Sequence, residues 1–178
     1  MATNEEVRVS KELRAQAREL GLCDEWYNAW RDHTPYSLLI QKMVDGYDFC
    51  VEKDWPSPKY VCDNFPVPVL RENGVFCNDT SIARNMRNVV VMGDSVVKLE
   101  YNDFSFGDVR VRHSSKAEVH AESLAIVHIH AYEHADVSVF ADEGAKVTLY
   151  VHNKSVKYVI EGDADVVGPK YKKSDENG

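Results

Sequence analysis

The second half of the chain repeats one hydrophobic pattern every ten residues. Every tenth residue from Leu99 to Val159 is a branched aliphatic, and every tenth residue from Ser95 to Ser155 is small. Within each repeat, apolar and polar positions alternate, as they do from Val127 to Ala131. This alternation predicts a short strand with one buried face. The constant spacing is typical of a solenoid, in which successive coils place side chains of the same kind on top of one another.

Ten residues are too few to enclose a core, so we expect each coil to contain two repeats, or about 20 residues. The pattern therefore predicts a parallel β-solenoid over residues 91–167, with two facing sheets and about three and a half coils. The inward aliphatic residues would form one column on each sheet. These columns are Val109, Ile129 and Leu149 on one sheet, and Leu99, Val119, Val139 and Val159 on the other. A long antiparallel meander of ten-residue units is the structural alternative.

Residues 1–90 lack the repeat and favour short helices. Ser10 is a candidate N-cap, and Thr34-Pro35 predicts the start of a helix that runs to about Lys53. The segment Phe65–Val69 carries two prolines at alternate positions, which predicts an extended strand-like conformation. We expect this helical region to cap the first coil, because an uncovered strand edge would expose unpaired backbone groups.

Three tryptophans, Trp26, Trp30 and Trp55, lie in the helical region. They could form a stacking platform for sugars or bases, or they could pack the short helices together. Aromatic side chains bury large areas, so we expect packing. At the other end of the chain, residues 168–178 begin with Gly-Pro and then carry lysines, which predicts a flexible charged tail.

Charge and composition narrow the classes of function. The chain has 178 residues with a net charge of -8, and 44% of them are hydrophobic, which is typical of a soluble, acidic protein. Residues 1–90 carry 11 Lys and Arg against 14 Asp and Glu, and the remainder carries 10 against 15, so neither half is basic. We therefore expect no nucleic-acid binding. No apolar run reaches the roughly 18 residues of a membrane span, and no signal peptide is visible, so we expect a cytoplasmic protein without membrane contact.

Histidines are the most unusual chemical feature, since six of the seven fall between His113 and His152. The alternation places His120, His128 and His130 on outward faces of strands. His128 and His130 are two residues apart, so both imidazoles would stand on one face, where they could share a metal ion. The outward histidines could instead line an interface between subunits or be ordinary solvated side chains. The interface candidates are His120, His128, His130, Arg110 and Tyr150.

No nucleophile elbow, phosphate-binding loop or dinucleotide fingerprint is present in the sequence. We therefore expect no cofactor and favour a non-enzymatic protein over an enzyme. The leading hypothesis is a structural or interaction protein that presents a rigid solenoid face to a protein partner or to further copies of itself. The alternatives are a metal-binding enzyme or a carbohydrate-binding β-helix that uses the outward histidine face.

The repeat Val-x-Val-x-Ala with small corner residues resembles the repeat of bactofilin-like β-solenoids over residues 91–167. Separately, the stretches Leu20–Trp26, Gly46–Cys50 and Leu70–Val75 are similar to small uncharacterised proteins of gut bacteria and their phages. This second resemblance implies a phage or mobile-element accessory protein that could be assembled into a virion, and it carries over no catalytic residue.

Overall fold

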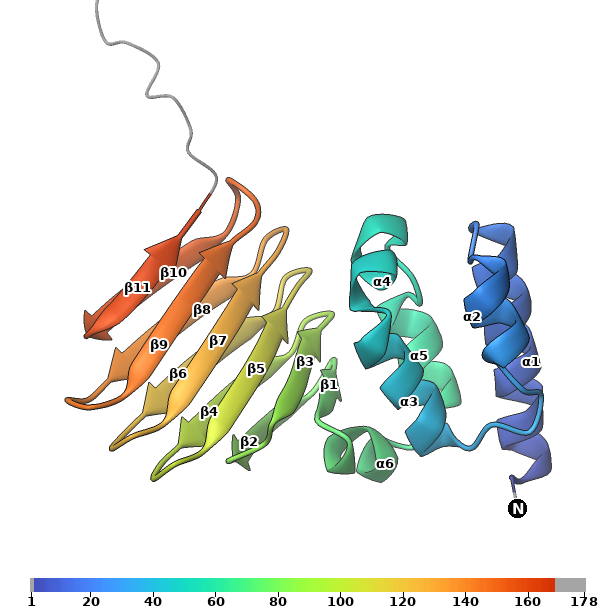
Figure 1. Ribbon diagram of the computed structural model, residues 1–178, viewed down its shortest axis with the longest axis horizontal. Helices are drawn as coiled ribbons and strands as arrows, with labels where there is room; N and C mark the ends of the chain where they lie inside the picture. Colours follow the sequence, from blue (N-terminus) through green and yellow to red (C-terminus); the bar gives the residue numbers. More distant parts are fainter. Residues whose placement is uncertain (1, 169–178) are drawn as a thin grey trace, which may run out of the picture. The chain divides into compact units, whose positions relative to one another are not determined.

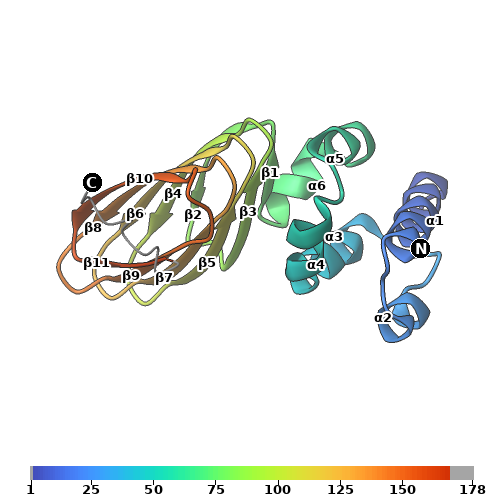
Figure 2. The ribbon, with the colours of Figure 1, turned by 90° about the horizontal axis from the view of Figure 1, so that it is seen from above.

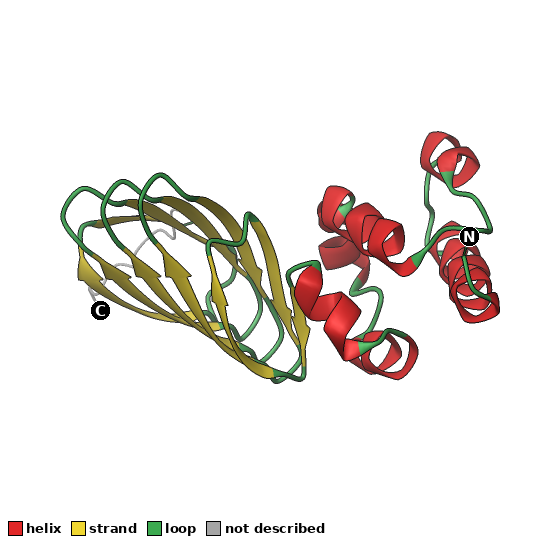
Figure 3. Cartoon of the chain, turned by 90° about the horizontal axis from the view of Figure 1, so that it is seen from below, coloured by secondary structure: helices red, strands yellow, loops and turns green. Residues whose placement is uncertain are grey.

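The computed structural model describes residues 2–168 and divides them into two compact units, a helical unit that ends at Cys77 and a β unit that begins at Asn78 (Figures 1 and 3). Of the tail predicted over residues 168–178, only Gly168 lies within the described residues. None of the helices formed by residues 2–168 combines the length and apolar character that a membrane span requires.

The helical unit consists of short helices followed by one short strand. They are α1 (Asn4–Glu19), α2 (Asp24–Ala29), α3 (Tyr36–Asp45), α4 (Tyr47–Lys53), α5 (Pro58–Asn64), α6 (Val67–Glu72) and β1 (Val75–Cys77). The apolar stripe of α1 includes Leu13 and Ala17, and both are fully buried. The helix that was expected to run from Thr34 to Lys53 divides into α3 and α4 at Gly46.

The N-terminus of α1 differs from the prediction. Thr3, not Ser10, is the N-cap, because Thr3 and Glu6 form a capping box in which each side chain accepts a hydrogen bond from the other's backbone N–H. Ser10 lies inside α1 and is fully buried. Its hydroxyl donates a hydrogen bond to the carbonyl oxygen of Arg31 at 3.0 Å and accepts one from Trp30 Nε1 at 3.1 Å.

The prediction that residues 65–69 are extended is confirmed for Phe65 and Pro66 and was wrong from Val67 onward, where α6 begins. Pro68 lies in the first turn of that helix, where a backbone N–H has no helical partner in any case. The second proline therefore costs the helix no hydrogen bond.

The β unit is a parallel β-solenoid, as predicted (Figure 2). The pairs from β3–β5 to β7–β9 are shifted by 20 residues per coil, as in Ile129↔Leu149, whereas the outer pairs are also parallel but have other shifts, as in Thr80↔Val96. One sheet has the order β3-β5-β7-β9-β11 and the other β2-β4-β6-β8-β10. The strands are β2 (Thr80–Arg84), β3 (Asn88–Met92), β4 (Val96–Tyr101), β5 (Phe106–Val111), β6 (Lys116–Ala121), β7 (Ile126–Ala131), β8 (Asp136–Ala141), β9 (Lys146–Val151), β10 (Lys157–Gly162) and β11 (Ala164–Val167).

The inward columns confirm the predicted register in the centre of the stack. Ile129 is paired with Val109 on one side and Leu149 on the other, and all three are completely buried. The stack begins earlier than residue 91, because Thr80 in β2 is already paired in parallel with β4. The repeat is hard to recognise there, since Asp79 stands at a position where later repeats have a branched aliphatic residue.

The corners between strands also repeat every ten residues. Asp103, His113, Ser123 and Glu133 all have positive φ, between 54° and 60°. This left-handed residue lets the chain turn, and the small residue two positions later, such as Ala135, points into the core and is fully buried. The small residue is visible in the sequence as a repeat, whereas the left-handed position carries no sequence signature because its side chains differ so widely.

The predicted register fails in the last coil. Val159 is paired with Ser138 and is 56% exposed, while Ile160 takes the place opposite Val139. The corner before β10 holds one extra residue, so that Val156 rather than Ser155 is buried. Because side chains alternate along a strand, a slip of one residue turns the whole of β10 over.

One coil fills its core differently from the next two. Tyr101 is paired with Ala121, and Gly107 is paired with Val127. The coil of β4 and β5 therefore has a large residue at 101 and a small one at 107, whereas the next coil has a small residue at 121 and a larger one at 127. The Tyr101 hydroxyl donates a hydrogen bond to the carbonyl oxygen of Met86 at 2.9 Å. A Cβ atom on Gly107 would lie 2.5 Å from the Tyr101 ring, so the tyrosine occupies the space that Val127 fills one coil later.

Candidate interaction surface

The outward side chains of β5, β7 and β9 form one continuous surface, which we call the ladder face. Parallel pairing places Asp108, His128 and Thr148 in one column. A second column contains Arg110, His130 and Tyr150, and this column unites three of the five interface candidates. His128 belongs to the ladder face as well, so the predicted outward direction of both neighbouring histidines is confirmed.

Aromatic rings stack along the ladder face. The rings of His130 and Tyr150 are nearly parallel, with centroids 4.6 Å apart and planes at 9°. His128 contacts Phe106 and Tyr150 at right angles, with centroid distances of 5.5 Å and 6.2 Å. The stacked rings of His130 and Tyr150 come from adjacent coils, so they contact each other along the stack.

His130 also forms a hydrogen bond with His152, with 3.1 Å between Nδ1 of the first ring and Nε2 of the second. The ring centres are 5.4 Å apart and the planes differ by only 19°, so the two imidazoles meet edge to edge. One nitrogen donates and the other accepts, which requires at least one neutral ring. His152 stacks in turn on Tyr132, with centroids 4.2 Å apart, and this extends the ladder face by one column.

The protonation of His130 is disfavoured by its surroundings. Burial is the main cause that lowers the pKa of its imidazole below 6.5. The neighbouring His152, Arg110 and His128 lower this pKa further, whereas the carboxylate of Asp108 raises it. Arg110 in turn donates a hydrogen bond to Asp108 at 2.8 Å, so part of the negative charge is already neutralised.

An apolar ridge borders the ladder face at the corners that precede β5 and β7. Phe104 is 85% exposed and Leu124 is 52% exposed, and the ridge continues into Phe106 and Ile126, which are paired on adjacent strands. The guanidinium of Arg87 lies 5.6 Å from the centroid of the Phe106 ring. Exposed apolar groups that lie next to one another, with charged groups at their rim, are typical of sites that bind another macromolecule.

His120 does not join the other interface candidates. It lies on β6, in the opposite sheet, where its ring stacks on Phe140 with centroids 4.6 Å apart. Its Nε2 is 2.6 Å from a carboxylate oxygen of Glu118. The structure therefore separates His120 from His128 and His130 by the full thickness of the coil.

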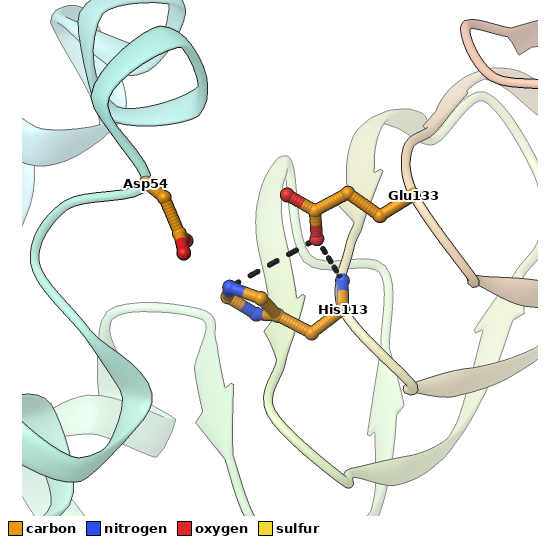
Figure 4. Close-up of side chains that lie close together, drawn as sticks. All are labelled: Asp54, His113 and Glu133. Atoms are coloured by element: carbon orange, nitrogen blue, oxygen red, sulfur yellow. Dashed lines mark hydrogen bonds and ion pairs between the residues drawn. The ribbon is translucent and has the colours of Figure 1, made fainter.

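A second polar cluster lies in the corners on the side of the solenoid, at His113 and Glu133 (Figure 4). Glu133 accepts hydrogen bonds from Arg112 Nη2 at 2.9 Å and from the backbone N–H of His113 at 2.6 Å. His113 Nδ1 accepts a hydrogen bond from the backbone N–H of Gly93 at 3.1 Å. Each of these contacts joins one coil to the next, so the cluster holds neighbouring corners together.

We expect Glu133→Ala to lower the free energy of unfolding by about 2–3 kcal/mol, because it removes a carboxylate from a buried guanidinium. The side chain of Arg112 is only 2% exposed. Chemical denaturation followed by circular dichroism measures the effect. Glu143→Ala is the matched control, since Glu143 is exposed and lies in the corner one repeat later. An equal effect of the two substitutions would contradict the role given to Glu133.

The metal hypothesis for His128 and His130 stays a prediction. Within residues 2–168, neither histidine belongs to a cluster of three or more side chains whose metal-ligating atoms lie close together. His128 contacts aromatic rings, and His130 uses its Nδ1 atom in the hydrogen bond with His152.

Several residues of this surface were not predicted from the sequence, namely Phe106, Tyr132 and His152. The signal for the last two was available, because Arg112, Tyr132 and His152 follow one another at intervals of 20 residues. Comparisons of the chain with protein-family models, with curated proteins and with solved structures gave no match, so the assignment of this surface rests on its geometry.

Proposed function

We propose that this protein is a non-enzymatic interaction protein that binds a second copy of itself through the ladder face. The observation that supports the proposal is the continuous outward array of His130, Tyr150, His128 and Phe106 next to an exposed apolar ridge. Aromatic residues and arginine are enriched at protein interfaces, where they supply most of the binding energy.

The orientation of the rings favours a protein partner over a carbohydrate. A sugar ring packs on the flat face of an aromatic side chain, whereas the stacked rings of His130 and Tyr150 cover each other's faces. Their edges carry the imidazole nitrogen and the phenol hydroxyl. These polar edges suit hydrogen bonds with another protein.

Charge favours a second copy as the partner. The whole chain has a net charge of -8, so two copies repel one another over most of their surface. On the ladder face, Asp108 is already paired with Arg110, and Arg87 and Lys146 border the apolar ridge. Two copies therefore meet less opposing negative charge on these strands than over the rest of the surface, and the carboxylates of Asp103 and Glu122 stay at the rim, in the corners that hold Phe104 and Leu124.

The molecular mass in solution, measured by sedimentation over a range of concentrations, tests this proposal. We expect a dimer for the unmodified chain and a shift to monomer for the double variant His130→Ala with Tyr150→Ala. The matched control is His120→Ala with Phe140→Ala, because it removes an equivalent stacked pair, also 4.6 Å apart, from the opposite sheet. A monomeric unmodified chain, or equal weakening by both variants, would rule out the ladder face.

The dimer should also dissociate as the pH falls from 7.5 towards 5.5. Burial already lowers the pKa of His130 below 6.5 in the single chain, and an interface over this ring would bury it further. The dimer is therefore favoured while the ring is neutral and weakens as the pH falls and the ring gains a proton. A positive His130 would lie beside Arg110, His128 and His152, with only Asp108 to compensate. Light scattering at both pH values measures dissociation. Dissociation by a chelator at pH 7.5 would instead support the metal hypothesis, since a chelator leaves the histidines neutral.

We further propose that the dimer serves as a scaffold in a phage virion or in a mobile-element accessory complex in the cytoplasm. This part of the proposal rests on the resemblance to bactofilin-like solenoids and to small proteins of gut bacteria and their phages. Capsid or tail genes beside the gene for this chain would support it, and a neighbourhood of metabolic genes would count against it.

A further inference from the structure

A cavity of about 310 Å³ lies within the helical unit, between residues of α1, α2, α3 and α4. Its wall is largely aromatic and includes Trp26, Trp30, Phe49 and Trp55. Gly46 lies against the Trp26 ring, at a distance where a Cβ atom would make an ordinary van der Waals contact of 3.6 Å. A volume of this size is at the lower end of the range of small-molecule sites, about 300–1,000 Å³. The cavity therefore suits a compact ligand with an apolar body.

Two of the three tryptophans, Trp30 and Trp55, offer the cavity ring carbons rather than hydrogen-bond donors. Trp30 Nε1 donates to the hydroxyl of Ser10 at 3.1 Å, and Trp55 Nε1 donates to Gln16 Oε1 at 2.9 Å. Both acceptors belong to α1. The two indoles thus use their only polar atom inside the helical unit, and a ligand can interact with them only through apolar contacts and the π system.

Two observations show that these rings suit a cation. Phe49 and Trp55 both line the cavity and meet edge to face, at 79° with centroids 6.0 Å apart, so two differently oriented rings border the same space. The ammonium of Lys42 already lies 5.7 Å from the centroid of the Trp30 ring. Aromatic faces attract cations because their π electrons carry partial negative charge, and sites lined by several aromatic rings bind organic ammonium ions.

The charged residues of the lining favour a cation as well. Asp45 and Asp48 both line the cavity, and Lys42 is the only cationic side chain in the same lining. Two carboxylates against one ammonium leave a net negative charge. We propose that this cavity binds a small organic ammonium ion whose apolar body is about the size of one phenyl ring.

Three probes with one phenyl ring and different charge test this inference on the full chain: 2-phenylethylammonium, 2-phenylethanol and the slightly larger 3-phenylpropanoate. Tryptophan fluorescence and calorimetry measure the dissociation constants. We expect the ammonium ion to bind about tenfold more tightly than the alcohol, and the carboxylate to bind most weakly. Equal affinities, a reversed order or no binding of any probe would overturn the proposal.

The carboxylates are tested by the double variant Asp45→Asn with Asp48→Asn. We expect it to weaken binding of the ammonium ion about threefold or more and to leave binding of the alcohol unchanged. The matched control is Asp63→Asn with Glu72→Gln, because both residues are exposed, belong to the same unit and lie outside the cavity lining. Thermal unfolding verifies that every variant is folded. An equal loss in the control would show a general effect of charge and would overturn the assignment of Asp45 and Asp48.

Discussion

Ile129→Ala is expected to lower the free energy of unfolding by about 2–5 kcal/mol. Ile129 is completely buried between Val109 and Leu149 in the central column of one sheet. Its truncation leaves a cavity that the neighbouring coils cannot fill, because strand pairing holds their spacing constant. Chemical denaturation of the full chain, followed by far-ultraviolet circular dichroism, measures the change.

Ile126→Ala is the matched control for this prediction. Ile126 lies on the same strand as Ile129 but is 40% exposed on the opposite face. The same chemical change should therefore cost much less there. If Ile129→Ala left the unfolding midpoint unchanged, or if both substitutions cost the same, the packing of this column would be wrong.

The pair Tyr101 and Gly107 should show strong coupling in a double-mutant cycle. Tyr101→Ala alone should cost about 3–5 kcal/mol, because it empties the space above Gly107. Gly107→Val alone should cost about 1–3 kcal/mol through overpacking, although it brings the coil closer to the repeat. Together they reproduce the combination of Ala121 and Val127 in the next coil, so the double variant should lose clearly less than the sum.

Denaturant midpoints of the three variants measure this coupling. Additive losses would mean that Tyr101 and Gly107 do not share one space. The cycle also shows that the residue most common in the repeat is not always the best one. Val is the residue that the repeat favours at position 107, yet Gly107→Val is expected to destabilise this chain. A stable single variant Gly107→Val would contradict the close approach of the Tyr101 ring.

The solenoid could be predicted because stacking converts spacing along the chain into position in space. Side chains 20 residues apart lie on top of one another, so an aliphatic column such as Val109, Ile129 and Leu149 can be read directly from the sequence. The outward direction of His128 and His130 follows from the same alternation. Neither inference requires knowledge of any contact between distant parts of the chain.

Other features depend on the length of a corner or on the packing of helices, and the sequence pattern does not reveal these. Val159 continues the aliphatic pattern, yet one extra corner residue buries Val156 and turns β10 over. Two prolines predicted an extended segment, but the first turn of α6 tolerates Pro68. The aromatic cavity arises only when the helices pack together. The capping of the first coil by residues 1–90 stays a prediction.

The alternation of successive repeats between two sheets also restricts how such a chain can lengthen during evolution. Duplication of a whole coil would leave every later strand on its original sheet. Duplication of a single ten-residue repeat between His130 and Tyr150 would keep every buried residue buried, yet it would move Tyr150 to the opposite sheet. The fold would survive this event, while the stacked pair on the outer surface would be lost. Selection on the surface, rather than on stability, would therefore favour changes of length in whole coils.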